Sequence, residues 1–192
     1  MELPDKRAGW VSIDNTKAMS EVVELLFENG HENIMVISGK KNAGVTVDRM
    51  TGVFDAMQRR GKRLSQEDIL YCDYSEQAAY EKTKEYLQKY GTTRHTAFLC
   101  FSDLMALGVL KAIREAGYRV PQDFSVTGFD GIPLTEYTTP PLTTVWQDMK
   151  ANGYAGAKLL HDHIKGKKTA LHSTLPYKLM QRESVQNICS RK

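Results

Sequence analysis

The sequence predicts an α/β fold, with an open, mostly parallel, doubly wound sheet and helices on both of its faces. Two observations lead to this prediction. Short apolar runs, typical of buried strands, alternate with amphipathic helical segments along most of the 192 residues. The connections between them are short, and such an alternation favours a parallel sheet that is covered on both sides.

The first half of the chain contains three strand–helix pairs. A short extended run at residues 11–13 leads into a helix that ends near Asn29 and is closed by Gly30. The other strands expected in this half are residues 34–37 and 68–72, and the other helices are residues 47–60 and 75–90.

Residues 97–147 are the stretch around which the rest of the chain is organised. They read as a strand (97–101), a helix (102–117), a second strand (124–129) and a loop that ends in a Pro-Pro turn. Ser102 caps the helix, and Asp103 adds negative charge to its first turn. Two parallel strands joined by a helix form a right-handed βαβ unit. Three segments follow: a helix at 149–164 that is relatively rich in small residues, a last strand at 173–181 and a polar tail at 185–192.

Composition excludes several classes of protein. The formal net charge of +3 is too small to indicate a nucleic-acid-binding surface. No segment has the apolar length of a membrane helix, and the N-terminal residues lack the apolar core of a signal peptide. Cys72, Cys100 and Cys189 are odd in number and widely spaced, so we expect free thiols and a cytoplasmic location.

Enzyme motifs are absent from the sequence. There is no GxGxxG after a strand, no GxxxxGK[ST], no GxSxG and no HExxH. His161 and His163 lie two residues apart on one helix and therefore point to different sides, which disfavours a metal site. We therefore expect no catalytic activity, no metal and no cofactor.

Four residues stand out as a candidate ligand site: Arg49, Tyr74, Ser102 and Asp130. The last three directly follow expected strands, and Arg49 opens the helix after another, so all four should converge on the carboxyl edge of the sheet, where ligands bind in such folds. A carboxylate, a guanidinium and an aromatic face suit a polyhydroxylated ligand.

Each of these residues also has a purely structural explanation. Arg49 could pair with a neighbouring carboxylate, Tyr74 could anchor a loop, and Ser102 caps a helix whether or not it binds anything. Asp130 could accept backbone N–H groups in the turn that follows it.

One long segment resembles a known family. SDLMALGVLKAIREAGYRVPQDFSVTGFDGIPLTEYTTPPLTTVWQ is similar to the effector-sensing core of LacI/GalR-type transcription regulators. The resemblance implies a lobe of the type I periplasmic-binding-protein kind. It also implies that Arg49 and Asp130 hydrogen-bond a sugar-like effector while Tyr74 stacks on it. Ser102 stands where these proteins commonly carry Asn, and Gly131 stands where a second polar residue is common.

The same resemblance implies a homodimer. Leu104, Met105 and Leu107 make the first half of the helix at 102–117 apolar on nearly every side, which is unusual for a surface helix. The helix could simply be deeply buried, but an exposed apolar patch usually marks an interface. Similar regulators dimerise through this helix and the loop at 134–140, so we expect Leu104, Leu107 and Tyr137 at the interface.

The resemblance further implies a domain organisation. Residues 11–145 would form the C-terminal lobe of the effector-binding domain, 146–172 a crossover helix segment belonging to a missing N-terminal lobe, 173–184 the returning strand, and 185–192 a tail. DNA would be bound only through a helix-turn-helix that is absent from this chain. The alternative is a fragment of a periplasmic-type sugar-binding protein of a transporter, which has the same two-lobed architecture.

Overall fold

Six strands form the central sheet, in the order β3-β2-β4-β5-β6-β8. The computed structural model describes residues 9–167 and 172–189. Neighbouring strands are parallel except at the β6–β8 edge, which is antiparallel. The strands of this sheet are β2 (Ile34–Ser38), β3 (Ile69–Tyr71), β4 (Ala97–Cys100), β5 (Ser125–Asp130), β6 (Thr143–Gln147) and β8 (Tyr177–Met180). The predicted open, mostly parallel sheet is confirmed.

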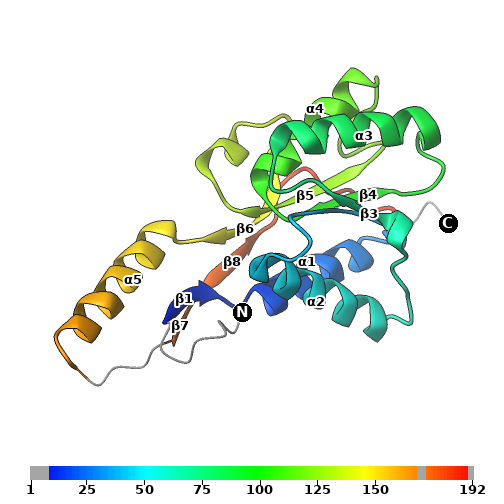
Figure 1. The fold of residues 1–192 in the computed structure, drawn as a ribbon. Coiled ribbons are helices and arrows are strands. Elements are labelled where there is room, and N and C mark those ends of the chain that lie inside the picture. Colours follow the sequence, from blue (N-terminus) through cyan, green and yellow to red (C-terminus); the bar gives the residue numbers. More distant parts are fainter. Residues whose placement is uncertain (1–8, 168–171, 190–192) are drawn as a thin grey trace.

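Two pairs of helices cover the two faces of this sheet (Figure 1). One pair is α1 (Asn15–Glu28) with α2 (Gly44–Arg59), and the other is α3 (Glu76–Tyr90) with α4 (Asp103–Glu115). Every residue of β2 and β4 is buried, as expected for strands between two helical layers. The largest fully buried side chains include Phe98, Phe101, Phe124 and Phe129.

A glycine sets the close approach within each helix pair. A Cβ atom on Gly52 of α2 would lie 3.0 Å from the amide nitrogen of Ser20 in α1, and closer still to the carbonyl oxygen of Thr16. A Cβ atom on Gly108 of α4 would lie 3.0 Å from the amide nitrogen of Tyr80 in α3, and closer still to the carbonyl oxygen of Glu76. Each helix pair can therefore pack this closely only because a glycine, which has no side chain, lies at the contact.

The C-terminal part of the sheet differs from the sequence prediction in two places. Residues 143–147, which follow the Pro-Pro turn and for which no strand was expected, form β6. The single strand expected at 173–181 is two strands, β7 (His172–Leu175) and β8, separated by Pro176, whose ring nitrogen cannot donate to a ladder. β7 pairs with β1 (Trp10–Ile13) in a separate two-stranded sheet, so the run at 11–13 lies outside the central sheet.

Helix α5 (Met149–Ile164) has the predicted bounds and extends away from the central sheet, beside β1 and β7 (Figure 1). Asp162 is its one buried residue among those described. Met149, Leu160 and Ile164 are exposed, and a Cβ atom on Gly153 or Gly156 would meet nothing within 4 Å. One side of α5 is thus apolar, rich in small residues and uncovered in the part of the chain that the structure describes.

Parts of the predicted segments lie outside the described residues. These are residues 168–171 of the crossover segment and residues 190–192 of the tail. Among the described residues, no helix is long and apolar enough to cross a membrane.

Candidate functional site

Arg49 and Asp130 come together at the carboxyl edge of the sheet. Arg49 is buried, with 5% of its surface exposed, and its Nη2 lies 3.3 Å from Oδ1 of Asp130. Its Nε donates to Oδ1 of Asn15 at 3.0 Å, and its Nη1 donates to the carbonyl oxygen of Phe101. The guanidinium carbon also lies 3.7 Å from the ring centroid of Phe129. Arg49 is therefore fixed in one orientation by four different partners.

The Asp130 carboxylate can accept a further hydrogen bond. Its Oδ1 accepts from Arg49 and, at 2.9 Å, from Nε2 of Gln147. Its Oδ2 accepts no hydrogen bond from the described residues, and 28% of the side chain is exposed. Burial raises the pKa of Asp130, while the Arg49 charge and the bonds from Gln147 and Arg49 lower it. The same burial lowers the pKa of Arg49, against the opposing pull of Asp130.

The backbone is strained at two of the predicted site residues. Among described residues other than glycine, positive φ occurs at Asp73, Tyr74 and Asp130, with φ of 51°, 60° and 116°. Such conformations are uncommon for residues with a Cβ atom and cluster where a side chain must be aimed. They lie at the carboxyl ends of β3 and β5.

Tyr74 is held from two sides. Its hydroxyl lies 3.0 Å from Oγ1 of Thr46, in the first turn of α2. Its ring covers the backbone of Gly39, where a Cβ atom would lie 2.7 Å from Cδ2 of the ring and closer still to other ring atoms. Burial raises the pKa of Tyr74, and the nearby charge of Arg49 opposes that rise.

Ser102 serves as a helix cap in this structure. It is buried, and its Oγ accepts from the backbone N–H of Met105 at 3.3 Å. Its backbone neighbour Phe101 supplies the carbonyl oxygen that binds Arg49, which places Ser102 beside the Arg49–Asp130 pair. Contact between Ser102 and a ligand stays a prediction.

Sequence reasoning missed two polar members of this cluster. Gln147 ends β6 and donates to Asp130, while its Oε1 accepts from Asn152 of α5 at 3.4 Å. Asn15 is buried and joins Arg49 to β1, since its Nδ2 donates to Oγ of Ser12 at 3.0 Å. Recognising residues 143–147 as a strand would have brought Gln147 to the same edge. No sequence signal marked Asn15 beyond its place in the first turn of α1.

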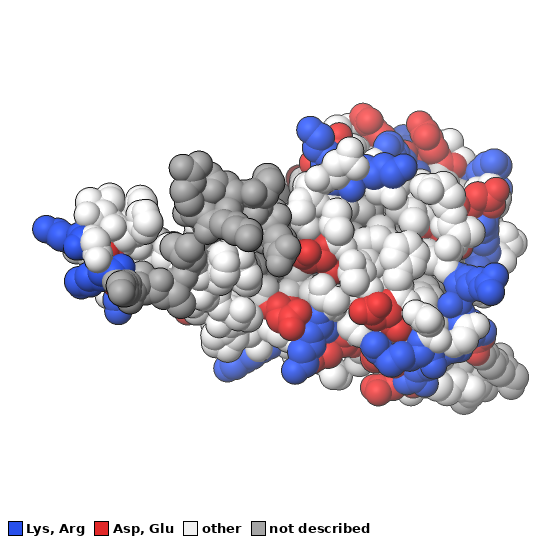
Figure 2. Space-filling model, turned by 60° about the horizontal axis from the view of Figure 1, so that its bottom comes forward, with Lys and Arg blue, Asp and Glu red and all other residues white. Residues whose placement is uncertain are grey.

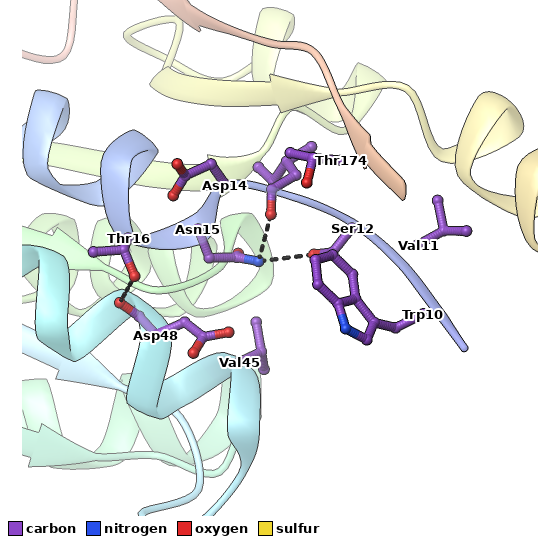
Figure 3. Close-up of a pocket in the computed structure, with 10 residues that line it drawn as sticks. Trp10, Val11, Ser12, Asp14, Asn15, Thr16, Val45, Asp48 and Thr174 are labelled. Atoms are coloured by element: carbon purple, nitrogen blue, oxygen red, sulfur yellow. Dashed lines mark hydrogen bonds between the residues drawn. The ribbon is translucent and has the colours of Figure 1, made fainter. Parts of the chain in front are cut away.

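A pocket adjoins this cluster at Asn15 (Figure 3). Its volume is about 340 Å³, and it lies between β1, β7 and the first turns of α1 and α2. The ring of Trp10 forms one side of it and stacks on His172 with the centroids 5.0 Å apart. The polar residues of its lining are Ser12, Asp14, Asn15, Thr16, Asp48 and Thr174. Arg49, Tyr74, Ser102 and Asp130 do not line this pocket.

Charge on the surface is mixed. On the face seen in Figure 2, acidic and basic side chains are interspersed among neutral ones. Within residues 9–167 and 172–189, no group of three or more His, Cys, Asp or Glu side chains could hold a metal ion. At the Arg49–Asp130 edge, the guanidinium donors and the Oδ2 acceptor of Asp130 can hydrogen-bond a polar ligand.

Comparison with known proteins finds one matching domain family and relatives that are transcription regulators. Residues 23–185 match the periplasmic binding protein-like domain family. The transcriptional regulator CelR of Thermobifida fusca is 31% identical over 95% of this chain, and the repressor CytR of Escherichia coli K12 is 33% identical over 90% of it. The chain spans about half the length of these relatives, 53% of CelR and 50% of CytR.

Solved structures of regulators also match the fold. A CelR–cellobiose complex superposes with a TM-score of 0.88 and 31% identity, over 96% of this chain and 56% of that one. A lac repressor dimer bound to operator and the anti-inducer ONPF superposes with a TM-score of 0.83 and 27% identity, over 92% of this chain and 60% of that one.

Proposed function

The chain belongs to the periplasmic binding protein-like family, as an effector-binding domain of the LacI/GalR type, and from that premise we propose that it senses a sugar-like effector and forms homodimers. The parent protein would be a cytoplasmic transcription regulator without catalytic activity. The relatives reported above are regulators, which favours this proposal over a transporter component.

The pairing of buried Arg49 with partly exposed Asp130 is the observation that carries the effector site. A guanidinium held by Asn15, Phe101 and Asp130 offers fixed donors, and the second oxygen of Asp130 offers an acceptor. Such an arrangement fits vicinal hydroxyl groups, each of which donates and accepts. The cellobiose named in the CelR complex supports a carbohydrate as the ligand class.

We assign the effector contacts to Arg49, Tyr74, Ser102 and Asp130, and we add Gln147. Gln147 shares Oδ1 of Asp130 with Arg49, so its side-chain amide lies at the same edge. Its bond to Asn152 ties this edge to α5. No metal or cofactor is part of the proposal.

An uncovered surface on α4 supports the dimer. Leu104 is 50% exposed and Tyr137, which follows the short helix η2 (Pro133–Glu136), is 79% exposed. Leu107 is half-buried, and together with Tyr137 it borders a groove of about 480 Å³. We call Leu104, Leu107 and Tyr137 the dimer face. The lac repressor structure is named as a dimer, which is consistent with this assignment.

We propose that a second lobe completes the site. Residues 11–145 and 173–184 would form one lobe, and the uncovered side of α5, within residues 146–172, would pack against the other. DNA would be read by a helix-turn-helix elsewhere in the parent protein. Because one lobe supplies only half of the contacts, this chain should bind sugars weakly and should not bind DNA.

Calorimetric titration and a gel-shift assay test the half-site proposal. We expect no heat signal with cellobiose or ribose in the micromolar range, and no shift of operator-like DNA. Micromolar sugar affinity, or a salt-sensitive shift of DNA, would overturn it.

Sedimentation tests the dimer face. Tyr137→Asp should convert a dimer to a monomer, because it puts a charge into an apolar contact. Tyr154→Asp on α5 is the matched control, since Tyr154 is 72% exposed but lies away from α4. Wild-type chain that stays monomeric at high concentration, or equal behaviour of the two variants, would contradict the assignment.

A further inference from the structure

Asp103 is a fully buried carboxylate that lies outside both the proposed effector contacts and the dimer face. It occupies the first turn of α4 and has no exposed surface. Its Oδ1 accepts from the hydroxyl of Thr144 in β6 at 2.6 Å. Its Oδ2 accepts from the backbone N–H of Ile132 at 2.8 Å. Asp103 thus binds two other elements at once.

The hydrogen bond from the Ile132 amide to Asp103 restrains a segment that connects the proposed effector edge to the dimer face. This segment, residues 130–137, begins at Asp130 on the proposed effector edge and ends at Tyr137 on the dimer face. Its first two residues, Asp130 and Gly131, have φ of 116° and 69°. The Asp130 conformation, which is uncommon for a residue with a Cβ atom, persists only where surrounding contacts hold it. The Ile132 amide, directly after them, is where Asp103 binds.

The sheet is shaped to admit this carboxylate. A Cβ atom on Gly128 of β5 would lie 3.3 Å from Cγ of Asp103 and closer still to its Oδ1. A Cβ atom on Gly131 would lie 2.5 Å from Cα of Trp146 in β6. Two glycines therefore bring β5, β6 and α4 close enough for one side chain to join them.

We infer that Asp103 is a positioning residue that joins the effector edge to the dimer face by holding residues 130–137 against α4 and β6. This inference rests on the proposed function for the roles of those two surfaces. A ligand that fixes Asp130 also restrains the segment that carries Tyr137. Dimer formation restrains Asp130 in return, because such coupling is reciprocal.

Thr144→Val tests the inference with little change of shape. The variant removes the hydroxyl that binds Oδ1 of Asp103 and leaves the Asp103 charge in place. Thr127→Val is the matched control: Thr127 is equally buried on the neighbouring strand β5, and its hydroxyl has no hydrogen-bond partner among the described residues. Asp103→Asn is the stronger variant, because an amide nitrogen cannot accept a hydrogen bond.

The first readout is the titration of the Asp130 carboxyl, followed by carbon-detected NMR in the 192-residue chain. Thr144→Val adds no charge, but the hydroxyl that it removes also lowers the pKa of Asp103, which interacts with Asp130. The Asp103 carboxyl is therefore followed in the same spectra, and a shift of Asp130 larger than that of Asp103 reports a changed position. We expect a shift of about half a pH unit or more in Thr144→Val and none in Thr127→Val. Equal titrations in wild type and Thr144→Val would overturn the link from Asp103 to Asp130.

The second readout is the dimer dissociation constant from sedimentation. We expect it to rise about fivefold or more in Thr144→Val and tenfold or more in Asp103→Asn, with Thr127→Val within about twofold of wild type. An unchanged constant in Thr144→Val would overturn the link to the dimer face. If Asp103→Asn does not fold, Thr144→Val still decides. A wild-type monomer contradicts the dimer face itself and this second link, whereas the Asp130 titration continues to test the first.

Discussion

Replacing Gly108 by Ala should separate α3 from α4 and destabilise the protein. The new Cβ atom would lie 3.0 Å from the amide nitrogen of Tyr80 and closer still to the carbonyl oxygen of Glu76. Both of those atoms belong to the backbone of α3, so no side-chain rotation relieves the contact. The helices would have to move apart by on the order of 1 Å. Because both contacts are with backbone atoms, the cost lies in the upper part of the range typical of overpacking, at ~2–3 kcal/mol. Alanine recovers up to ~1 kcal/mol through its higher helix propensity.

The expected net loss is ~1–2 kcal/mol, which corresponds to a fall in melting temperature of ~2–8 °C for a domain of this size. Urea denaturation followed by circular dichroism measures it as a lower midpoint with an unchanged slope. Gly153→Ala on α5 is the matched control, because a Cβ atom there meets nothing within 4 Å. It should leave the midpoint unchanged or raise it. A Gly108→Ala variant as stable as the wild type would refute the close-approach argument.

Three further predictions follow from the site. Arg49→Met should lower the free energy of unfolding by ~3 kcal/mol, because Asp130, Asn15 and the Phe101 carbonyl lose the hydrogen bonds that Arg49 donates. Urea titration measures this loss, and the control Arg59→Met, at an exposed arginine, should lower the same free energy by less than ~1 kcal/mol. Burial raises the pKa of Asp103 to about 6, so the folded chain binds its proton more tightly than the unfolded chain does. The free energy of unfolding should therefore fall as pH rises from about 4 to 6, and Asp103→Asn should flatten that slope; parallel pH profiles for the two proteins would contradict the assignment. Gly39→Ala should displace the Tyr74 ring and weaken the binding of any ligand that stacks on it. Quenching of tyrosine fluorescence on addition of sugar measures this binding. Quenching equal to that of the wild type would mean that the ring is not in the site.

The convergence of Arg49 and Asp130 could be predicted because it depends on topology alone. Parallel strands end at one edge of a sheet, so residues that follow different strands meet there. The pairing itself, at 3.3 Å, required the structure, since the sequence left a carboxylate close to Arg49 in the chain as an alternative partner. That these residues bind an effector stays a prediction.

Strand β6 was hard to predict because two of its three buried positions, Thr143 and Thr144, are polar and only Val145 is apolar. Thr143 and Thr144 are buried, and their partners are Ser184, Arg182 and Asp103, all distant in the sequence. Without that knowledge, no strand is expected after the turn at Pro140 and Pro141. Because β6 was not predicted, Gln147, the polar residue at its end, was not expected at the site.

The backbone conformations that orient the side chains of the site could not be predicted from the sequence either. Tyr74 and Asp130 have positive φ although neither is a glycine, and Gly39 makes room for the Tyr74 ring from a distance of 35 positions. These features result from tertiary packing that overrides local preference. Local patterns therefore gave the elements and their order, while contacts between distant residues determined the geometry of the site.

Binding of the effector at the Arg49–Asp130 edge can be examined by an NMR titration of this chain with a panel of mono- and disaccharides. At sugar concentrations up to about 100 mM, even binding with a dissociation constant of ~10 mM is visible. We expect shifts of the Arg49 Nε–H, the Gln147 side-chain amide and the backbone amides at Asp130 and Tyr74, and we expect these shifts to be lost in Asp130→Asn. Shifts that appear elsewhere while these signals stay fixed, or that persist in Asp130→Asn, would contradict binding at this edge.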